Sequence, residues 1–393
     1  MKKFFLFLFA CCLLPIAYCF SQGTWTQKAD FGGGSTNFAT GFSIGTKGYI
    51  GTGKDSTGTE TNAFWEYDPS SNTWTQKADF GGVPRAGAMG FAVGNKGYIG
   101  TGRSSVFFND IWEYDPTSNQ WIQKGNFPGT PRMYATGFSI GTKGYLATGD
   151  TTSGASYMND FWEYNPSNDT WTQLTFPGIA RAPGVGFSIG LKGYFGTGND
   201  LSDFPTQDWW EFNPSGNTWT QKANMPLRRC SASGFSAGTK GYVGTGQDSS
   251  INTKTFWEYN PSANSWIQKP DFGGTARRHA VGFSIGLNGY MGTGSFTKDF
   301  WEFDPNGNAV NETELENLIS VYPSPSADGK FTVSGLQFKV KIIDIYNVSG
   351  KLVYHSTVNR KQETVNLSEG SGIYFIHLST EKGSVTKKVL VQK

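Results

Sequence analysis

Cysteine is scarce in this chain, with four among 393 residues, and three of them lie within the first nineteen positions. The N-terminal stretch begins Met1-Lys2-Lys3, continues as an apolar run to Phe20, and places small residues three and one positions before Gln22. This pattern predicts a signal peptide, residues 1–21, and a lipoprotein signal anchored at Cys19 is the alternative. The mature chain then keeps only Cys230, so no disulfide forms within it and packing must hold the fold together.

Charged residues are also few, at 16%, and neither sign dominates. Residues 22–309 carry 21 Lys and Arg against 23 Asp and Glu, and residues 310–393 carry 10 against 8. Phosphate backbones demand a basic surplus that neither segment has, so we expect no nucleic-acid partner. Beyond the signal peptide we expect no transmembrane segment in the mature chain.

Glycine and aromatic residues, in contrast, are abundant, with 52 Gly and 16% aromatics, as in a turn-rich β protein. One pattern recurs along the chain: Gly-Phe-Ser-Ile, a turn of the Gly-Thr-Lys-Gly type, Gly-Tyr-Ile-Gly-Thr-Gly, a loop, Phe-Trp-Glu-Tyr-Asp-Pro and a tryptophan. The tyrosine that follows the turn stands at Tyr49, Tyr98, Tyr145, Tyr194, Tyr242 and Tyr290. The spacing of 47 to 49 residues, with four strand-like runs in each unit, is typical of a β-propeller blade.

The two ends of the repeat region complement each other. Five units end in a tryptophan, but the sixth stops at Pro305 with none following. The missing piece stands at the start, where Thr24-Trp25-Thr26-Gln27-Lys28 matches Thr73-Trp74-Thr75-Gln76-Lys77. A lone sheet cannot bury its aromatic faces, whereas a closed circle covers both. We therefore predict an all-β fold in which residues 22–305 form a six-bladed propeller closed by the N-terminal strand.

The Tyr-Ile-Gly-Thr-Gly run, the Tyr-Asp-Pro turn and the following tryptophan together resemble the kelch repeat family over residues 24–305. The resemblance implies a kelch propeller. The paired glycine of that family is here Gly-Thr-Gly, or Ala147-Thr148-Gly149 in the third unit, which alters at most the bend at the end of the second strand. We expect the recurring Trp and Tyr side chains to form the core between blades.

The repeat stops after Pro305. A polar linker, residues 306–317, leads into several short strand-like runs between 318 and 393, which predict a small Ig-like β-sandwich. The runs Val321-Tyr-Pro-Ser-Pro-Ser326 and Ser371-Gly-Ile-Tyr-Phe375, with Lys387 and Lys388 near the end, resemble the C-terminal sorting domain of type IX secretion substrates. That resemblance implies a partner, the type IX secretion machinery, and a protein secreted or held on the outer surface of a Bacteroidota-like cell. An ordinary Ig-like accessory module is the alternative.

A candidate ligand site follows from the face that carries the variable loops between the second and third strands of each unit. Five units share an arginine five residues before the first-strand glycine: Arg85, Arg132, Arg181, Arg229 and Arg277. A ring of guanidinium groups at the channel mouth would bind carboxylates or acidic sugars. The alternative is structural, with each arginine tying blades together through carbonyls and a nearby Asp or Glu.

Residues that break the repeat refine this candidate site. Near the predicted ring they are Tyr134, Arg228, Arg278 and His279, and in the variable loops they are Phe107, Phe108, Tyr157 and Phe204. Aromatic side chains beside arginine suit sugars or extended peptides. The alternative is that these aromatics only fill gaps in the loops.

Catalytic readings find less support in the residues. A galactose-oxidase-like enzyme, which the chain resembles in combining a kelch propeller with a β-sandwich, needs copper held by two His and two Tyr, one of them crosslinked to Cys; here the propeller has only His279, so we expect no metal and no cofactor. A sugar epimerase or mutarotase would need an acid–base pair such as His279 with Asp110 or Asp208. Both acids belong to an aspartate position before the third strand that recurs in four units, as Asp110, Asp160, Asp208 and Asp299. This recurrence favours a turn or interblade role over catalysis.

From the sequence we therefore predict a secreted or surface propeller that binds an extracellular glycan or protein through its variable-loop face. A sugar-active enzyme is the second hypothesis, and a purely structural surface protein is the third.

Overall fold

The computed structural model describes residues 23–152, 156–307, 319–335, 340–380 and 383–393. The predicted signal peptide and most of the predicted linker lie outside these residues, so the domain limits stay predictions. Every regular element in the described part of the chain is a β-strand. Within those same residues, no helix is long and apolar enough to cross a membrane.

Six four-stranded antiparallel sheets form the blades in the described part of residues 24–304. Blades 1 and 2 consist of β2 (Thr40–Ile44), β3 (Lys47–Gly51), β4 (Phe64–Asp68), β5 (Thr73–Gln76), then β6 (Met89–Val93), β7 (Lys96–Gly100), β8 (Ile111–Asp115), β9 (Gln120–Lys124). Blades 3 and 4 consist of β10 (Thr136–Ile140), β11 (Lys143–Asp150), β12 (Tyr157–Asn165), β13 (Thr170–Thr175), then β14 (Val185–Ile189), β15 (Lys192–Gly196), β16 (Trp209–Asn213), β17 (Thr218–Lys222). Blades 5 and 6 consist of β18 (Ser233–Ala237), β19 (Lys240–Gly244), β22 (Phe256–Asn260), β23 (Ser265–Lys269), then β24 (Val281–Ile285), β25 (Asn288–Gly292), β26 (Phe300–Asp304) and the N-terminal β1 (Thr24–Gln27).

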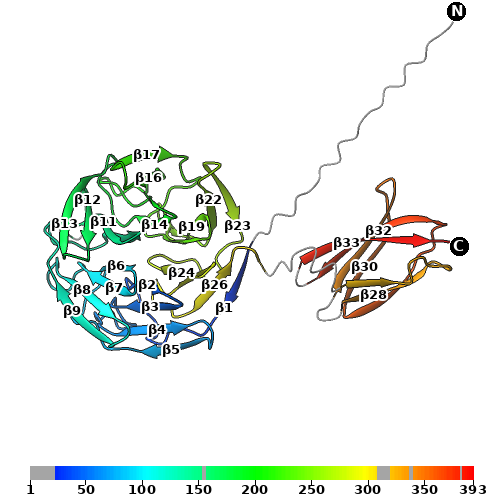
Figure 1. Cartoon of the computed structure of the whole chain (residues 1–393), viewed down its shortest axis with the longest axis horizontal. Helices are drawn as coiled ribbons and strands as arrows, with labels where there is room; N and C mark the ends of the chain where they lie inside the picture. Colours follow the sequence, from blue (N-terminus) through cyan, green and yellow to red (C-terminus); the bar gives the residue numbers. More distant parts are fainter. Residues whose placement is uncertain (1–22, 153–155, 308–318, 336–339, 381–382) are drawn as a thin grey trace, which may run out of the picture.

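The first strand of each blade is the innermost. These strands contact one another in the order β2, β6, β10, β14, β18 and β24, and β24 contacts β2. Figure 1 shows the resulting ring, with the fourth strands at its outer rim. A short hairpin of β20 (Gln247–Asp248) and β21 (Ile251–Asn252) decorates the variable loop of blade 5.

The N-terminal strand completes blade 6. Strand β1 pairs antiparallel with β26, and Trp25 stands opposite Phe303. The Trp25 ring lies 4.9 Å from the ring of Phe256 and 5.1 Å from that of Phe272. Its Nε1 donates a hydrogen bond to the carbonyl of Pro270 at 3.3 Å. Residues from the first and last blade segments therefore share one sheet, with Trp25 packed against blade 5.

Aromatic packing between neighbouring blades forms the core of the ring. Between blades 1 and 2, the buried Phe42, Tyr49 and Phe64 pack against Tyr114 and the half-buried Trp121. The glycine at the second position of each second strand makes room for this contact. A Cβ on Gly97, for example, would lie 2.3 Å from the Phe42 ring. The recurring Trp and Tyr side chains are thus part of the interblade core, as the repeat predicts.

Residues 319–391 form a second, separate all-β unit. One sheet contains β27 (Ile319–Tyr322), β28 (Lys330–Gly335) and β31 (Gln362–Asn366), and the other contains β30 (Leu352–Arg360), β29 (Val340–Asn347), β32 (Gly372–Thr380) and β33 (Gly383–Val391). Phe331 and Val333 from the first sheet share one buried cluster with Ile343, Ile345 and Ile376 from the second. Two sheets with a common apolar core make this unit a small β-sandwich.

Replacing Trp25→Ala tests how strongly the N-terminal strand holds the ring. The change removes ring contacts with Phe256, Phe272 and Phe303, so the free energy of unfolding should fall by about 3 to 5 kcal/mol. Urea unfolding followed by fluorescence measures it. The matched control is Thr24→Ala, an exposed position on the same strand, for which we expect a change within about 0.5 kcal/mol. A loss at Trp25 as small as that of the control would contradict the docking role.

Candidate functional site

The candidate site begins with six equivalent positions just before the innermost strands, two residues after each predicted arginine position. This mouth ring consists of Phe38, Gly87, Tyr134, Pro183, Ser231 and His279. All except the proline have left-handed backbone, with φ between 53° and 64°. Bulky residues rarely adopt that conformation, and it costs roughly 1 to 3 kcal/mol where the surroundings impose it.

Backbone hydrogen bonds between blades impose this conformation on the mouth ring. The Gly87 N–H donates to the carbonyl of Phe38 at 2.9 Å, and the Tyr134 N–H donates to the carbonyl of Gly87 at 2.8 Å. The His279 N–H donates in the same way to the carbonyl of Ser231 at 2.9 Å. At these three places, one blade thus fixes the position of the mouth residue on the next.

Three members of the ring form an aromatic cluster: Phe38, Tyr134 and His279. The Phe38 and His279 rings lie 4.3 Å apart between centroids, and Tyr134 lies 5.7 Å from Phe38 and 5.8 Å from His279. Tyr134 extends across blade 2 because Gly87 has no side chain; a Cβ there would lie 2.9 Å from the tyrosine ring. The cluster, together with Pro183 and Ser231, lines a pocket of about 130 Å³.

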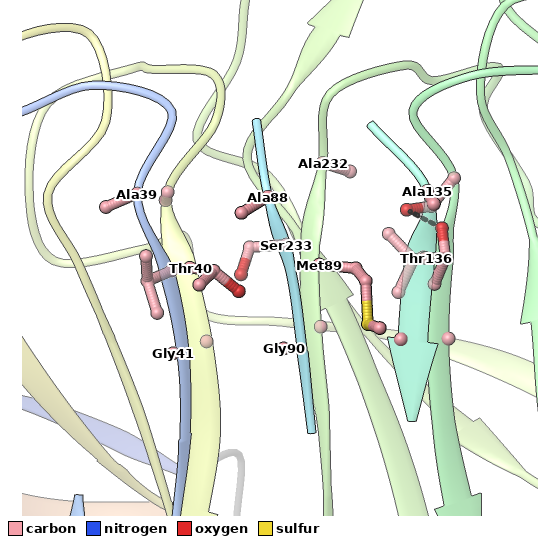
Figure 2. A pocket seen from close by; sticks show the side chains of 18 residues that line it. Ala39, Thr40, Gly41, Ala88, Met89, Gly90, Ala135, Thr136, Ala232 and Ser233 are labelled. Carbon is pink, nitrogen blue, oxygen red and sulfur yellow. Dashed lines mark hydrogen bonds between the residues drawn. The ribbon is translucent and has the colours of Figure 1, made fainter. Parts of the chain in front are cut away.

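The channel continues below the mouth ring as a space of about 150 Å³. Its walls are the next three residues of each blade, and Figure 2 shows their short side chains, among them Thr40, Ser233 and Thr136, with Met89 as the longest. The Thr136 hydroxyl donates to the carbonyl of Gly184 at 3.0 Å. This part of the channel, below the mouth ring, therefore suits water or a narrow polar group, while the mouth ring provides the aromatic surface.

Burial keeps the aromatic cluster uncharged at neutral pH. Desolvation, with a smaller contribution from Arg278, lowers the pKa of His279 to about 3. Desolvation, with a smaller contribution from Asp150, raises the pKa of Tyr134 to about 12. The imidazole Nδ1 is buried and has no hydrogen-bond partner among the residues that the structure describes.

The five arginines do not form the ring that the sequence suggested. Their side chains are 0% exposed: Arg85, Arg132, Arg181, Arg229 and Arg277. In blade 3, for example, Nη1 of Arg132 donates to the carbonyl of Thr148 at 2.9 Å and Nη2 donates to Asp160 at 2.8 Å. The same carboxylate accepts from the Trp162 indole at 2.9 Å. The guanidinium groups of Arg85, Arg132, Arg181 and Arg277 are therefore held inside their own blades by an aspartate. The structural alternative named carbonyls and acidic residues as partners, but it expected them to tie neighbouring blades together.

Blades 1 and 5 depart from this arrangement in different ways. In blade 1 both partners are gone, because Thr36 replaces the arginine and Ala63 the aspartate. In blade 5 only the carboxylate is gone: Arg229 remains and Thr255 stands at the aspartate position. In both blades the indole N–H that would donate to the aspartate, Trp65 or Trp257, is buried without a partner.

Comparisons with known proteins found a match for the C-terminal unit and a match for the propeller. Residues 320–392 match the family model described as the secretion system C-terminal sorting domain. This chain is a β-propeller protein with a type IX secretion sorting domain. The solved structure titled "Structure of YjhT" covers 70% of the propeller protein at a TM-score of 0.60 and 15% identity, with 95% of that chain covered. At this identity the likeness shows the fold alone. No curated protein sequence matched the chain.

These findings confirm the predicted all-β propeller fold and the predicted sorting tail, and the propeller protein is secreted or displayed on the outer surface. The sorting domain engages the type IX machinery as its partner. The aromatic positions in the loops remain predictions, and the structure places them outside the mouth pocket.

The loop aromatics have neighbours of their own. Phe107 is half-buried and lies 5.7 Å from the guanidinium of Arg103, and Phe108 covers Arg85 at 4.0 Å. The Tyr157 hydroxyl donates to Asp203 at 3.2 Å. Other loop aromatics are open to solvent, such as Phe204 at 63% exposure. The structure thus brings Tyr134 and His279 together but leaves Phe107 and Tyr157 on the surrounding loops.

Phe38 is the mouth residue that the sequence reading missed. The available signal was its offset, since it lies three residues before Gly41 as Tyr134 lies three before Gly137. The nominated acids are also accounted for: Asp110 and Asp208 accept from Arg85 and Arg181 and from the adjacent indoles. Cys230 is buried, and that burial raises the pKa of its thiol.

Removing the carboxylate of one buried pair should be more harmful than removing the whole pair. Asp160→Ala leaves Arg132 charged and buried, which should lower the free energy of unfolding by roughly 3 to 5 kcal/mol. The double change Arg132→Thr with Asp160→Ala copies blade 1 and should cost clearly less. Urea unfolding of both variants and of the wild type decides it. A double variant as unstable as Asp160→Ala, or less stable, would show that the charge is not the cause.

Acid should destabilise the propeller partly through His279. Its pKa is lowered in the folded state from 6.5 to about 3, so the unfolded chain binds the extra proton first. The stability contributed is complete above pH 6.5 and is lost as the pH falls towards 3. His279→Phe, which keeps a ring beside Phe38, should flatten this part of the stability profile. Identical slopes for the two proteins between these pH values, measured by thermal unfolding, would refute the assignment.

Proposed function

We propose that this secreted propeller binds an extracellular glycan at the mouth ring, with the aromatic cluster as its contact surface. The supporting observation is asymmetry on a symmetric scaffold. Phe38, Tyr134 and His279 occupy positions where the other blades have Gly87, Pro183 and Ser231, and all three hold left-handed backbone. Rigid rings that face a pocket are the usual means of gripping an apolar ligand surface.

The dimensions of the pocket limit what it accepts. A volume of about 130 Å³ is below the several hundred Å³ of sites for whole drug-sized ligands. One terminal unit of a chain, such as a single sugar ring, suits it, and the rest of the ligand would lie on the variable loops. The uncharged His279 and Tyr134 favour the apolar face of a neutral sugar over an acidic group.

A protein ligand is the second candidate, and a separate observation favours it. The variable loops expose apolar side chains beyond the mouth: Val106 at 57%, Leu201 at 56% and Ile251 at 73%. Exposed apolar groups on loops suit a protein surface better than a sugar. A glycan that uses the mouth alone would be insensitive to these positions.

The sugar-active enzyme and the structural surface protein remain as alternatives to binding. The enzyme hypothesis has lost its nominated acids, because Asp110 and Asp208 are both held by buried arginines. A purely structural protein would have no use for strained aromatic residues at a pocket.

The aromatic cluster can be tested by substitution. Tyr134→Ala should weaken binding of a glycan selected on a glycan array by at least about tenfold, since a buried aromatic anchor typically contributes 2 kcal/mol or more. Calorimetry gives the dissociation constant, and an unchanged melting temperature shows that the variant is folded. Leu191→Ala, at a 77%-exposed site in the hairpin between β14 and β15, is the matched control.

The outcomes separate the hypotheses. Loss of glycan binding in Tyr134→Ala but not in Leu191→Ala supports the mouth as a glycan site. If binding to a protein partner is instead lost in Leu201→Ser and Ile251→Ser, the loops carry a protein interface. Glycan affinity within twofold of wild type in Tyr134→Ala would remove the mouth from consideration.

A further inference from the structure

Arg229 is a buried cation without the carboxylate that its counterparts have. Arg85, Arg132, Arg181 and Arg277 each form an ion pair with an aspartate of their own blade. The described residues contain no such pair for Arg229, although its side chain is 0% exposed. Burial lowers the pKa of Arg229 to about 10, so it still carries its charge at neutral pH. An unpaired buried charge of this kind is costly, and it needs an explanation.

The intact blades show where the partner belongs. In blade 3, one carboxylate oxygen of Asp160 lies between Nη2 of Arg132 at 2.8 Å and Nε1 of Trp162 at 2.9 Å. The carboxylates of the four ion pairs are 11% to 23% exposed. A carboxylate at this position therefore touches solvent, and an external one has a route to it.

Blade 5 keeps the donors but supplies a shorter side chain. Thr255 accepts a hydrogen bond from Nη2 of Arg229 through its hydroxyl. The hydroxyl ends one atom earlier than the carboxylate of an aspartate, and Nε1 of Trp257, whose counterparts donate to that aspartate, is buried without a partner among the described residues. In four other blades the arginine Nε donates to a carbonyl, as Arg132 does to Thr130 at 2.9 Å, whereas Nε of Arg229 is buried without a partner among the described residues. Two buried donors of blade 5, Nε of Arg229 and Nε1 of Trp257, thus lack the acceptors that their counterparts have in the four blades with an ion pair.

The other charges near Arg229 do not fill this role. Asp248 and Asp271 act on it only through space, and Asp271 pairs with Lys254 at 4.0 Å. Blade 1 also lacks the aspartate, but it has no unpaired arginine, because Thr36 stands at the arginine position there. Retention of Arg229 in blade 5 is what distinguishes the two.

We propose that blade 5 binds the carboxylate of an external small acid beside Thr255, with Arg229 and Trp257 as the hydrogen-bond donors. The external group replaces the aspartate of the other blades and neutralises the buried guanidinium. The site is separate from the mouth pocket, which contains none of these residues. Formate is the smallest carboxylate and serves as the first probe of the site. Glucuronate tests whether the bound carboxylate can belong to a larger molecule.

The test compares the full-length protein with Thr255→Asp, which restores the internal carboxylate. Without added acid, the variant should melt at a higher temperature than the wild type. Sodium formate should raise the melting temperature of the wild type by about 2 to 4 °C more than that of the variant. General salt effects act on both proteins and cancel. An equal formate response in the two proteins, or a variant that melts below the wild type, would overturn the proposal.

A spectroscopic measurement covers the case in which Thr255→Asp fails to fold. The indole N–H resonance of Trp257, assigned through Trp257→Phe, should shift on formate titration of the wild type and saturate. The resonance of Trp162, whose indole already donates to Asp160, is the internal control and should stay in place. An unmoved Trp257 resonance, or equal shifts of both, would also refute the site. Saturation by glucuronate as well would extend the same site to acidic sugars.

Discussion

Each blade of this protein has two aromatic faces, and neither can be covered except by another blade. Phe42, Tyr49 and Phe64 of blade 1 are buried only because blade 2 supplies Tyr114 and Trp121. The same requirement passes from blade to blade until blade 6 meets blade 1, where Val281, Phe283 and Tyr290 pack against Ile50 and Tyr67. The described part of the propeller has no disulfide, and contacts between neighbouring blades join the ring. Trp25 belongs to this constraint, because without strand β1 blade 6 would lack its outer strand.

The architecture could be predicted from the sequence because one arrangement is written repeatedly. A tyrosine and a glutamate stand at the Tyr49 and Glu66 positions of every unit, and the hydrogen bond between their side chains, 2.6 Å in blade 1, recurs although their separation varies from 12 to 18 residues. Features that depend on departures from the repeat were harder to predict from the sequence. Arg132 and Asp160 are 28 positions apart, and the sequence alone does not say whether the guanidinium turns inward to that carboxylate or outward to the channel. Hydrogen bonding decides it, since Nε, Nη1 and Nη2 of the inward Arg132 each donate to a carbonyl or to the carboxylate, which offsets the cost of desolvation.

The residues of the mouth ring were also difficult to predict from the sequence. Phe38 escaped notice because Thr36 stands where the other units have arginine, so the landmark for the offset was missing. That Tyr134 reaches Phe38 and His279 depends on Gly87, which lies in a different blade and is unremarkable in its own unit. The loop aromatics Phe107 and Tyr157 were identified by type, but their direction is set by contacts with Arg103 and Asp203. Contacts between units cannot be inferred from any single unit.

Charge and function are separated within each blade. The arginines sit inside the wall, where their hydrogen bonds to threonine carbonyls and aspartates hold the loops of one blade together. The mouth ring, two residues further on, is therefore presented on a braced backbone and can change its side chains without disturbing the charges behind it. This explains how Gly, Pro, Ser, Phe, Tyr and His can all stand at one position. We therefore expect a missing aspartate to cost more stability than a changed mouth residue. Tyr134 faces a pocket, whereas Arg229 lies in the wall, where each unpaired donor raises the energy of the folded state.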